Sequence, residues 1–313
     1  MVFESKILVL GGSGLIGSAI VRRLQIEGYS HIDAPTRAEL NLMNRAEVSA
    51  YFQSTSPEFV FMAAGRVGGM FATSRYPAEF LFENVTLLTN VIDCAFRAGV
   101  TKLMNIACSC CYPREAPQPL EPRSIGSGSL EPTMAAFGTA KLAGIEMCRA
   151  YFDQYGFQAI SVMGTNTFGP NDNFDMATSH ALPAMIRKFH EAKVCGAKTV
   201  EILGTGKPRR EFMAVDDLAD GCLFLMTKYA ENIPINLARG EDLSIYELAQ
   251  IVQRVVGFGG QIGLIPQAGD GVLRKIQDVS AIQKLGWKPK IELEVAIRDT
   301  YTWYLQSLLD SKN

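Results

Sequence analysis

The stretch Lys6-Ile-Leu-Val-Leu10-Gly11-Gly12-Ser13-Gly14-Leu15-Ile16-Gly17 decides the fold. Its apolar half predicts a buried strand, and the glycines lead into a helix that runs through Ala19-Ile-Val-Arg-Arg-Leu24. Glycines at positions 11, 14 and 17 let the backbone turn sharply and approach a pyrophosphate, whose charge is favoured at a helix N-terminus. Between a strand and a helix, this run predicts a dinucleotide site rather than a purely structural turn.

The rest of the first half alternates apolar runs with amphipathic stretches. Residues 59–64, 102–107 and 159–163 predict further buried strands, and residues 134–155 predict a long helix. We therefore expect an α/β fold with a Rossmann-type, doubly wound parallel sheet. Residues 1–175 would form this domain, with later segments returning to it. Residues 176–313, with an isolated strand at 199–203, would mainly form a smaller, interleaved, substrate-binding α/β domain.

Composition narrows the class of protein. The chain has 313 residues, of which 48% are hydrophobic and 20% charged, and its net charge is −2. This balance argues against a nucleic-acid partner, and the absence of a signal peptide or a long apolar run argues against a membrane. The seven cysteines are an odd number without metal-ligand spacing. We expect reduced thiols, no metal and a cytoplasmic location.

The choice between NAD and NADP depends on the residues after the second predicted strand. An acidic residue there suits the ribose 2′-hydroxyl of NAD, whereas an arginine suits the 2′-phosphate of NADP. Asp33 lies at about the right distance, but Arg37 follows it at the predicted strand end. Arg37 could also be an ordinary surface charge. The sequence favours NADP(H).

A catalytic motif follows in the segment Phe137-Gly-Thr-Ala-Lys141. Its spacing resembles the Tyr-x-x-x-Lys motif of short-chain dehydrogenases, with phenylalanine at the tyrosine position. The segment Ala107-Cys-Ser-Cys-Cys-Tyr-Pro113 resembles the strand end that supplies the assisting serine, and Cys108 stands at the serine position. If this is a strand, neighbouring Ser109 points to the opposite side. Both usual hydroxyls are therefore missing.

Later blocks identify a narrower resemblance. They include Glu39-Leu-Asn-Leu42, Val67-Gly-Gly69, Phe168-Gly-Pro170, Asp172-Asn-Phe174, Ser179-His180 with Leu182-Pro183, Pro208-Arg-Arg-Glu-Phe212, Asp270-Gly271, Arg274-Lys275 and Leu285-Gly-Trp287. Together they resemble the GDP-L-fucose synthase family over nearly the whole chain. Members of that family invert C3 and C5 of a nucleotide 4-keto-6-deoxy sugar and then reduce the C4 ketone with NADPH.

The resemblance implies roles for individual residues. Cys110 and His180 match the acid/base pair of the two inversions, and reference pKa values of about 8.5 and 6.5 suit that chemistry. Lys141 would hold the nicotinamide ribose. The implied cofactor contacts are Gly11, Gly12, Ser13, Gly14, Leu15, Ile16, Gly17, Arg37, Asn41, Leu42, Ala63, Ala64, Lys141, Gly164, Asn166, Thr167 and His180. The implied substrate contacts are Asn166, Lys188, Leu203, Arg210 and Asp270, with Lys188 and Arg210 against the phosphates.

Several departures from the family pattern matter for function. Phe137 has no proton to give, and Cys108 offers only a weak S–H donor. Loss of the general acid would cost about 10²–10⁴ in rate, and the weaker oxyanion contact about 10²–10³ more. Leu203 replaces a tryptophan, Lys188 replaces an arginine, and Gly164 replaces a proline.

These observations leave three functions open. The first is a bifunctional epimerase/reductase of a GDP-linked sugar in which Cys108 or water replaces the missing acid. The second is an epimerase alone, acting on a related sugar such as a GDP-6-deoxy-heptose with NADP(H) as a structural cofactor. The third is a non-catalytic NADP(H)-binding regulator, which the presence of Cys110 and His180 disfavours. A deliberate Tyr→Phe replacement would also explain Phe137 but would leave Cys108 unexplained. By resemblance, the expected assembly is a homodimer.

Overall fold

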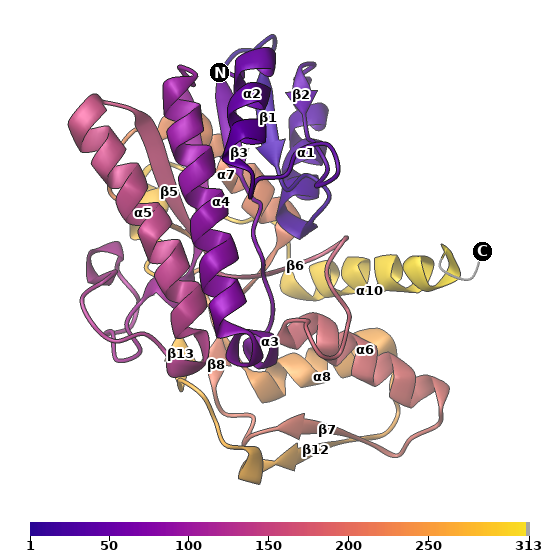
Figure 1. The fold of residues 1–313 in the computed structure, drawn as a ribbon. Coiled ribbons are helices and arrows are strands. Elements are labelled where there is room, and N and C mark those ends of the chain that lie inside the picture. The colour runs from indigo at the N-terminus through magenta and orange to yellow at the C-terminus, as the bar shows by residue number, and fades with distance from the viewer. Residues whose placement is uncertain (311–313) are drawn as a thin grey trace.

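Six parallel strands form the central sheet, in the order β10-β5-β4-β3-β1-β2 (Figure 1). The computed structural model describes residues 1–310. The strands are β1 (Ile7–Leu10), β2 (Ile32–Asp33), β3 (Phe59–Met62), β4 (Lys102–Cys108), β5 (Gln158–Gly164) and β10 (Ile235–Leu237). All residues of β1 and β3 are buried, which is typical of a parallel sheet covered on both faces. The predicted Rossmann-type fold is confirmed.

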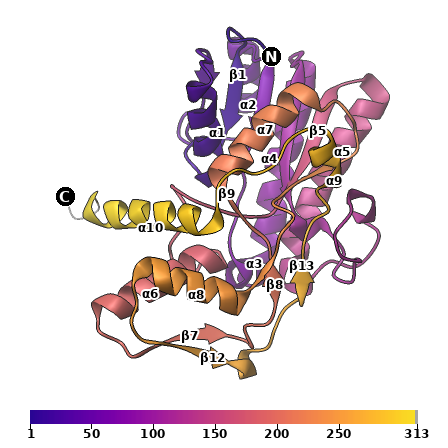
Figure 2. The same cartoon turned by 180° about the vertical axis from the view of Figure 1, so that it is seen from behind.

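Helices cover both faces of this sheet. One face carries α2 (Arg45–Thr55), α4 (Pro77–Arg97) and α5 (Ala135–Tyr155), and the opposite face carries α1 (Leu15–Ile26) and α7 (Val215–Lys228) (Figures 1 and 2). The helix α5 agrees with the one predicted over residues 134–155. It ends where Gly156 takes a left-handed φ of 69°, the usual glycine stop at a helix C-terminus.

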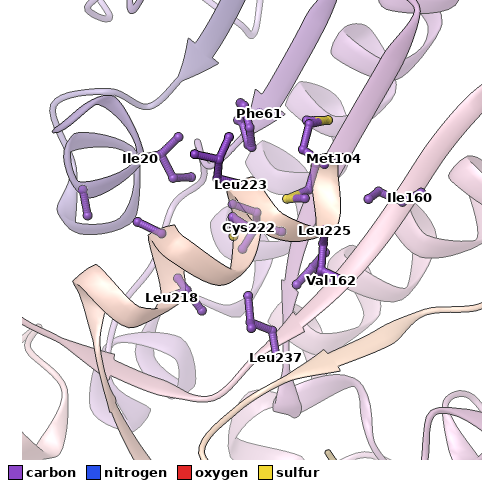
Figure 3. Close-up of a cluster of buried hydrophobic side chains, with 14 of the residues drawn as sticks. Ile20, Phe61, Met104, Ile160, Val162, Leu218, Cys222, Leu223, Leu225 and Leu237 are labelled. Atoms are coloured by element: carbon purple, nitrogen blue, oxygen red, sulfur yellow. The ribbon is translucent and has the colours of Figure 1, made fainter. Parts of the chain in front are cut away.

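A segment far down the chain completes the core of this domain. Figure 3 shows Leu218 and Leu223 of α7 packed beside Ile20 of α1, Phe61 of β3 and Leu237 of β10. Residues 215–237 thus return to the sheet formed by the first half of the chain, as the interleaved arrangement predicts. The domain boundary at residue 175 stays a prediction.

The other elements lie beyond the carboxyl ends of the strands (Figures 1 and 2). The helices there are α6 (Ala181–Val194), α8 (Ile245–Val256) and α10 (Leu293–Asp310), which share a second apolar core. Three small sheets also lie there. One pairs β7 (Thr199–Leu203) with β12 (Gln261–Ile265), and another pairs β6 (Asn166–Phe168) with β9 (Phe212–Ala214). In the third, β8 (Arg209–Arg210) lies between β11 (Leu243–Ser244) and β13 (Arg274–Lys275). The predicted strand 199–203 is confirmed.

Short elements complete the chain. They are the helices α3 (Met70–Arg75) and α9 (Ser280–Lys284) and the 3₁₀ turns η1 (Ser109–Cys111), η2 (Pro122–Ser124), η3 (Pro132–Met134) and η4 (Pro266–Ala268). Among residues 1–310, no helix combines the length and the apolarity that crossing a membrane requires.

Candidate active site

The glycine-rich loop lies at the point where the strand order reverses. The strand β2 lies on one side of β1, and β3 lies on the other side. In open α/β sheets, ligands bind outside the carboxyl ends of the strands at the point where the strand order reverses in this way. Gly11 has a φ of +84°, and a Cβ there would lie 2.8 Å from the Ala64 backbone. A Cβ on Gly17 would lie only 2.1 Å from the Gly11 carbonyl oxygen. The loop therefore needs glycine at both positions.

The helix that follows this loop has free amide groups at its start. Gly14 is the N-cap of α1, and no side chain caps the first turn. The N–H groups of the first turn, which have no partner within the helix, can bind an anion there. The loop residues Gly11, Gly12, Ser13, Gly14, Leu15, Ile16 and Gly17 thus offer a backbone site suited to a pyrophosphate, and their role in binding the cofactor stays a prediction.

The residues after β2 and β3 border the same loop. The Asp33 carboxylate at the end of β2 accepts a 2.7 Å hydrogen bond from the Tyr51 hydroxyl. Arg37 lies in an exposed turn just beyond it, and no hydrogen bond or ion pair of its side chain occurs within residues 1–310. In the loop before α2, Leu42 accepts a hydrogen bond through its carbonyl, and Asn41 caps the next turn through its side chain.

The catalytic segment lies across two neighbouring strands. Cys108 ends β4 and pairs in register with Gly164 at the end of β5. Cys110 lies in the turn η1 that follows, and its Sγ is 2.7 Å from the Cys108 Sγ. Ser109 opens that turn and is not part of β4, so the alternation of side chains along a strand does not decide where it points. The structure brings the two predicted cysteines into direct contact.

On α5, Phe137 and Lys141 occupy one face, four residues apart. The Lys141 Nζ donates a 3.2 Å hydrogen bond to the Ile106 carbonyl and lies 5.9 Å from the centre of the Phe137 ring. Phe137 is 3% exposed and packs edge-on against Phe80, with ring centres 5.9 Å apart. A well-packed ring without a hydroxyl therefore fills the position of the family tyrosine.

The contact between the two cysteines makes their thiols differ in acidity. Hydrogen bonds from Cys110 and, to a lesser extent, Cys111 lower the pKa of the Cys108 thiol well below its ordinary value, and Lys141 acts in the same direction while burial opposes it. The hydrogen bond with Cys108 raises the pKa of Cys110, and burial raises it further. Of the two thiols, Cys108 is therefore the more acidic and Cys110 the less acidic.

His180 lies near these thiols as the N-cap residue of α6. The residue as a whole is exposed, yet desolvation of the imidazole lowers its pKa, and the Cys108 sulfur opposes that effect. The imidazole is therefore mainly neutral near pH 7 and can accept a proton.

Four of the predicted substrate residues follow one another along one edge of the smaller domain. The Lys188 Nζ donates to the Glu201 carbonyl of β7 at 2.8 Å, and Leu203 ends that strand with 51% of its surface exposed. Just beyond, Asp270 accepts hydrogen bonds of 2.9 and 2.6 Å from the Thr205 amide and hydroxyl. The carboxylate also raises the pKa of Arg210, which burial lowers more strongly.

Residues at the start of β6 join the two halves of the site. The Asn166 side chain donates a 2.8 Å hydrogen bond to the Glu211 carbonyl, and the Thr167 hydroxyl donates to the Thr165 carbonyl at 3.2 Å. Buried Gly164 accepts a 3.1 Å hydrogen bond from the Gln277 side chain. Ala63, which follows β3, donates its amide to the Leu10 carbonyl at 3.0 Å.

Sequence reasoning missed Lys275 as a site residue. It pairs in register with Arg210 through the strands β13 and β8. Burial lowers the pKa of its ammonium group most strongly, and the electrostatic interaction with the Cys110 sulfur is the largest effect that opposes this. No metal-binding group of three or more acidic, histidine or cysteine residues occurs in residues 1–310.

Known proteins share this architecture. The model of the NAD dependent epimerase/dehydratase family matches residues 7–238. GDP-L-fucose synthase 1 of Arabidopsis thaliana is 47% identical over 97% of this chain and 94% of its own. A GDP-6-OMe-4-keto-L-xylo-heptose reductase of Campylobacter jejuni superposes with a TM-score of 0.93 at 35% identity, covering 98% of this chain and 99% of its own. A GDP-mannoheptose C4 reductase of the same organism, solved with NADP bound, gives 0.89 at 37% identity and covers 97% and 99%.

These relatives span nearly the full length of both chains, and their names agree with the resemblance seen in the sequence. The protein is accordingly an enzyme of the NAD dependent epimerase/dehydratase family and belongs, within it, to the GDP-L-fucose synthase group.

Proposed function

We propose that this protein is an NADP(H)-binding epimerase/reductase of a GDP-linked 4-keto-6-deoxy sugar, in which the inversions at C3 and C5 are intact and the reduction at C4 is severely slowed. One contrast carries the proposal. Cys110 and His180 retain the groups that proton exchange needs, whereas Phe137, 3% exposed, fills the position of the proton donor for hydride transfer. The GDP-linked substrate rests on the names of the relatives.

The protonation states support the inversion chemistry. A 4-keto group acidifies the neighbouring C–H bonds, so one group must remove a proton and a second must return one to the opposite face. His180, whose pKa is lowered by burial, is the neutral base of this pair. Cys110, whose pKa is raised, carries the proton to be returned. The Lys275 ammonium lowers the cost of the negative charge that the thiol pair gains.

Hydride transfer has different requirements. The bound dinucleotide would supply the hydride, and the oxygen at C4 would become an alkoxide that needs a proton. Phe137 has no proton to give. The hydrogen bond from Cys110 lowers the pKa of the Cys108 thiol, which favours its ionised form. An ionised sulfur beside a developing alkoxide opposes it electrostatically. Both replacements therefore slow reduction more than they slow proton exchange.

The NADP(H) assignment rests on the loop after β2. Asp33 already accepts the Tyr51 hydroxyl, whereas Arg37 is exposed and can contact a 2′-phosphate. The relative solved with NADP bound agrees with this choice. Lys141, Asn166 and Thr167 border the place of the nicotinamide ribose in this proposal.

The proposal includes a homodimer formed by the α4/α5 face. Leu81 and Phe82 on α4 are 37% and 66% exposed, and a second copy would cover this apolar surface. Light scattering coupled to size exclusion should give twice the mass of one chain, and Phe82→Glu should shift the mass towards one chain.

The function is tested with GDP-4-keto-6-deoxymannose in D₂O, with and without NADPH. We expect deuterium uptake next to the ketone in both samples, and NADPH consumption at least about 10²-fold slower than uptake. Cys110→Ser should lose uptake, whereas Cys195→Ser, which changes an exposed cysteine at the end of α6, should keep it. NADPH consumption that keeps pace with uptake would contradict the slowed reduction. Absence of uptake would contradict the epimerase and favour a regulator or another sugar.

A second candidate is the complete epimerase/reductase with Cys108 as the substitute acid. The position of Cys108 at the end of β4, next to Gly164 on β5, favours it because the assisting serine of the family stands there. In that case, Cys108→Ala would abolish NADPH consumption and leave deuterium uptake measurable.

A further inference from the structure

The contact between Cys108 and Cys110 creates a second chemistry at this site. Their Sγ atoms are 2.7 Å apart, and both thiols are free. A disulfide bond is about 2.05 Å long, so the two sulfurs need only a small further approach to become bonded. A serine at position 108, as in the family pattern, would have no such partner. The pair therefore results from a departure of this chain from the family pattern.

The pair also meets the chemical requirements for oxidation. Only a thiolate attacks a peroxide, and accessible thiols of low pKa react first. Cys108 is half-buried, and the hydrogen bond from Cys110 and the charge of Lys141 favour its ionised form. Cys110 is 6% exposed, and the hydrogen bond with Cys108 and burial raise its pKa, so this thiol ionises less readily and reacts second.

The other cysteines lack one or more of these features. Burial raises the pKa of Cys148 and of Cys222 to about 12 and also raises that of Cys94, so these three are inert. Cys195 is exposed, but its sulfur contacts only the Ala192 carbonyl, and no second thiol lies nearby within residues 1–310.

We propose that Cys108 and Cys110 form a hydroperoxide-reactive dithiol that closes to an intramolecular disulfide and is reopened by thiol reductants. The Cys108 thiolate attacks the peroxide and breaks its O–O bond, which gives a sulfenic acid and, with one proton, an alcohol or water. The Cys110 thiol then displaces the sulfenic hydroxyl, which leaves as a second water with the thiol proton. The two sulfurs together lose two electrons, and the peroxide gains them.

The effect on activity rests on the proposed function. An oxidised Cys110 has no thiol to exchange protons with the sugar, so the disulfide form cannot invert C3 or C5. Oxidation would thus stop the enzyme reversibly. Formation of the disulfide itself depends only on the two sulfurs and holds whatever the sugar is.

Cys111 is the competing partner, because the three cysteines lie within four residues. Its buried thiol donates to the Gly138 carbonyl of α5 at 3.8 Å and also interacts with the thiols of Cys108 and Cys110. Adjacent cysteines also close to a disulfide only with distortion of the backbone between them. Substitution at each position separates the two pairings.

The test uses the full-length protein treated with hydrogen peroxide, trapped with an alkylating reagent and digested with trypsin. One peptide, residues 103–114, carries all three cysteines. In the wild type, this peptide should lose two hydrogens and keep one alkylated cysteine, and dithiothreitol should restore three alkylations. Cys111→Ser and Cys195→Ser should still form the disulfide, whereas Cys108→Ser should not.

The remaining outcomes would contradict the pairing, the dithiol or the catalytic role of Cys110. A disulfide in Cys108→Ser that is absent from Cys111→Ser would assign the bond to Cys110 and Cys111 and overturn the pairing. Stable sulfinic acid, or no change in this peptide, would overturn the dithiol itself. If the disulfide forms but deuterium uptake persists, then the catalytic role proposed for Cys110 is wrong while the oxidation site stands.

Discussion

Restoring the missing hydroxyl is the most direct perturbation of this site. Phe137 lies on α5 one turn before Lys141, the spacing that places a lysine beside a tyrosine on the same helix face. Phe137→Tyr would add the proton donor where the reduction of C4 requires one. A positioned general acid contributes about 10²–10⁴ in rate, so we expect NADPH consumption to rise by that factor.

The new hydroxyl also has a structural cost. Phe137 is 3% exposed and packs against Phe80, so the hydroxyl enters a site with little access to water. A buried hydroxyl without a partner costs about 1–3 kcal/mol. We expect a lower melting temperature for the variant in the absence of substrate, and a melt separates this loss of stability from an effect on chemistry.

The assay follows NADPH absorbance after mixing with the 4-keto sugar, and deuterium uptake is followed in parallel. Uptake should change little, because Cys110 and His180 are untouched. Phe137→Leu is the matched control, since it alters the packing without adding a hydroxyl and should leave reduction slow. If Phe137→Tyr folds, binds NADPH and still consumes none, the missing hydroxyl is not what limits reduction and the reasoning fails.

Three other predictions concern the cofactor and stability. Arg37→Ala should weaken NADPH binding about tenfold and leave NADH binding nearly unchanged, as measured by fluorescence titration; equal losses for both would refute the 2′-phosphate contact. Gly17→Ala should weaken NADPH binding at least tenfold and lower the melting temperature, because its Cβ would lie 2.1 Å from a carbonyl oxygen; Gly259→Ala, where a Cβ meets nothing within 4 Å, should do neither. Burial raises the pKa of Asp172 to about 7. Between about pH 4 and pH 7, the folded protein therefore holds a proton that the unfolded chain has lost, and the free energy of unfolding falls as the pH rises through that window. Melting temperatures of Asp172→Asn should fall less between pH 5 and pH 8 than those of the wild type, and an unchanged slope would contradict the shift.

Much of the central fold follows from local pattern. Residues 59–64, 102–107 and 159–163 form strands close to the predicted bounds because fully buried parallel strands appear as short, continuous apolar runs. The helix predicted over residues 134–155 is long and ends at a glycine, which makes both its type and its end recognisable.

The smaller domain could not be predicted in the same way. Its strands β8, β11 and β13 have two residues each, too few for a periodic signal, and they pair across large sequence separations. That pairing places Lys275 beside Arg210, and nothing in the local sequence of Lys275 indicates it. One available signal was missed, since Ser244 and Glu247 form a capping box that marks the start of α8.

The site shows the same division between local and long-range information. The spacing of Cys108 and Cys110 is visible in the sequence, but their contact depends on where β4 ends and the turn η1 begins. Likewise, the sequence shows the phenylalanine at position 137, but only the structure shows that its ring packs edge-on against Phe80.

The two replacements act on one atom of the substrate in the proposed reaction. The family serine and tyrosine both serve the oxygen at C4, and here they are replaced by Cys108 at the end of β4 and Phe137 on α5. The proton-exchange pair comes from other elements, Cys110 from the turn η1 and His180 from the start of α6. Because the two sets of groups stand on separate elements, the donors to the C4 oxygen can be lost while the groups for C3 and C5 stay in place. A slowed reductase with a competent epimerase is therefore an outcome that this fold permits without any rearrangement of its core.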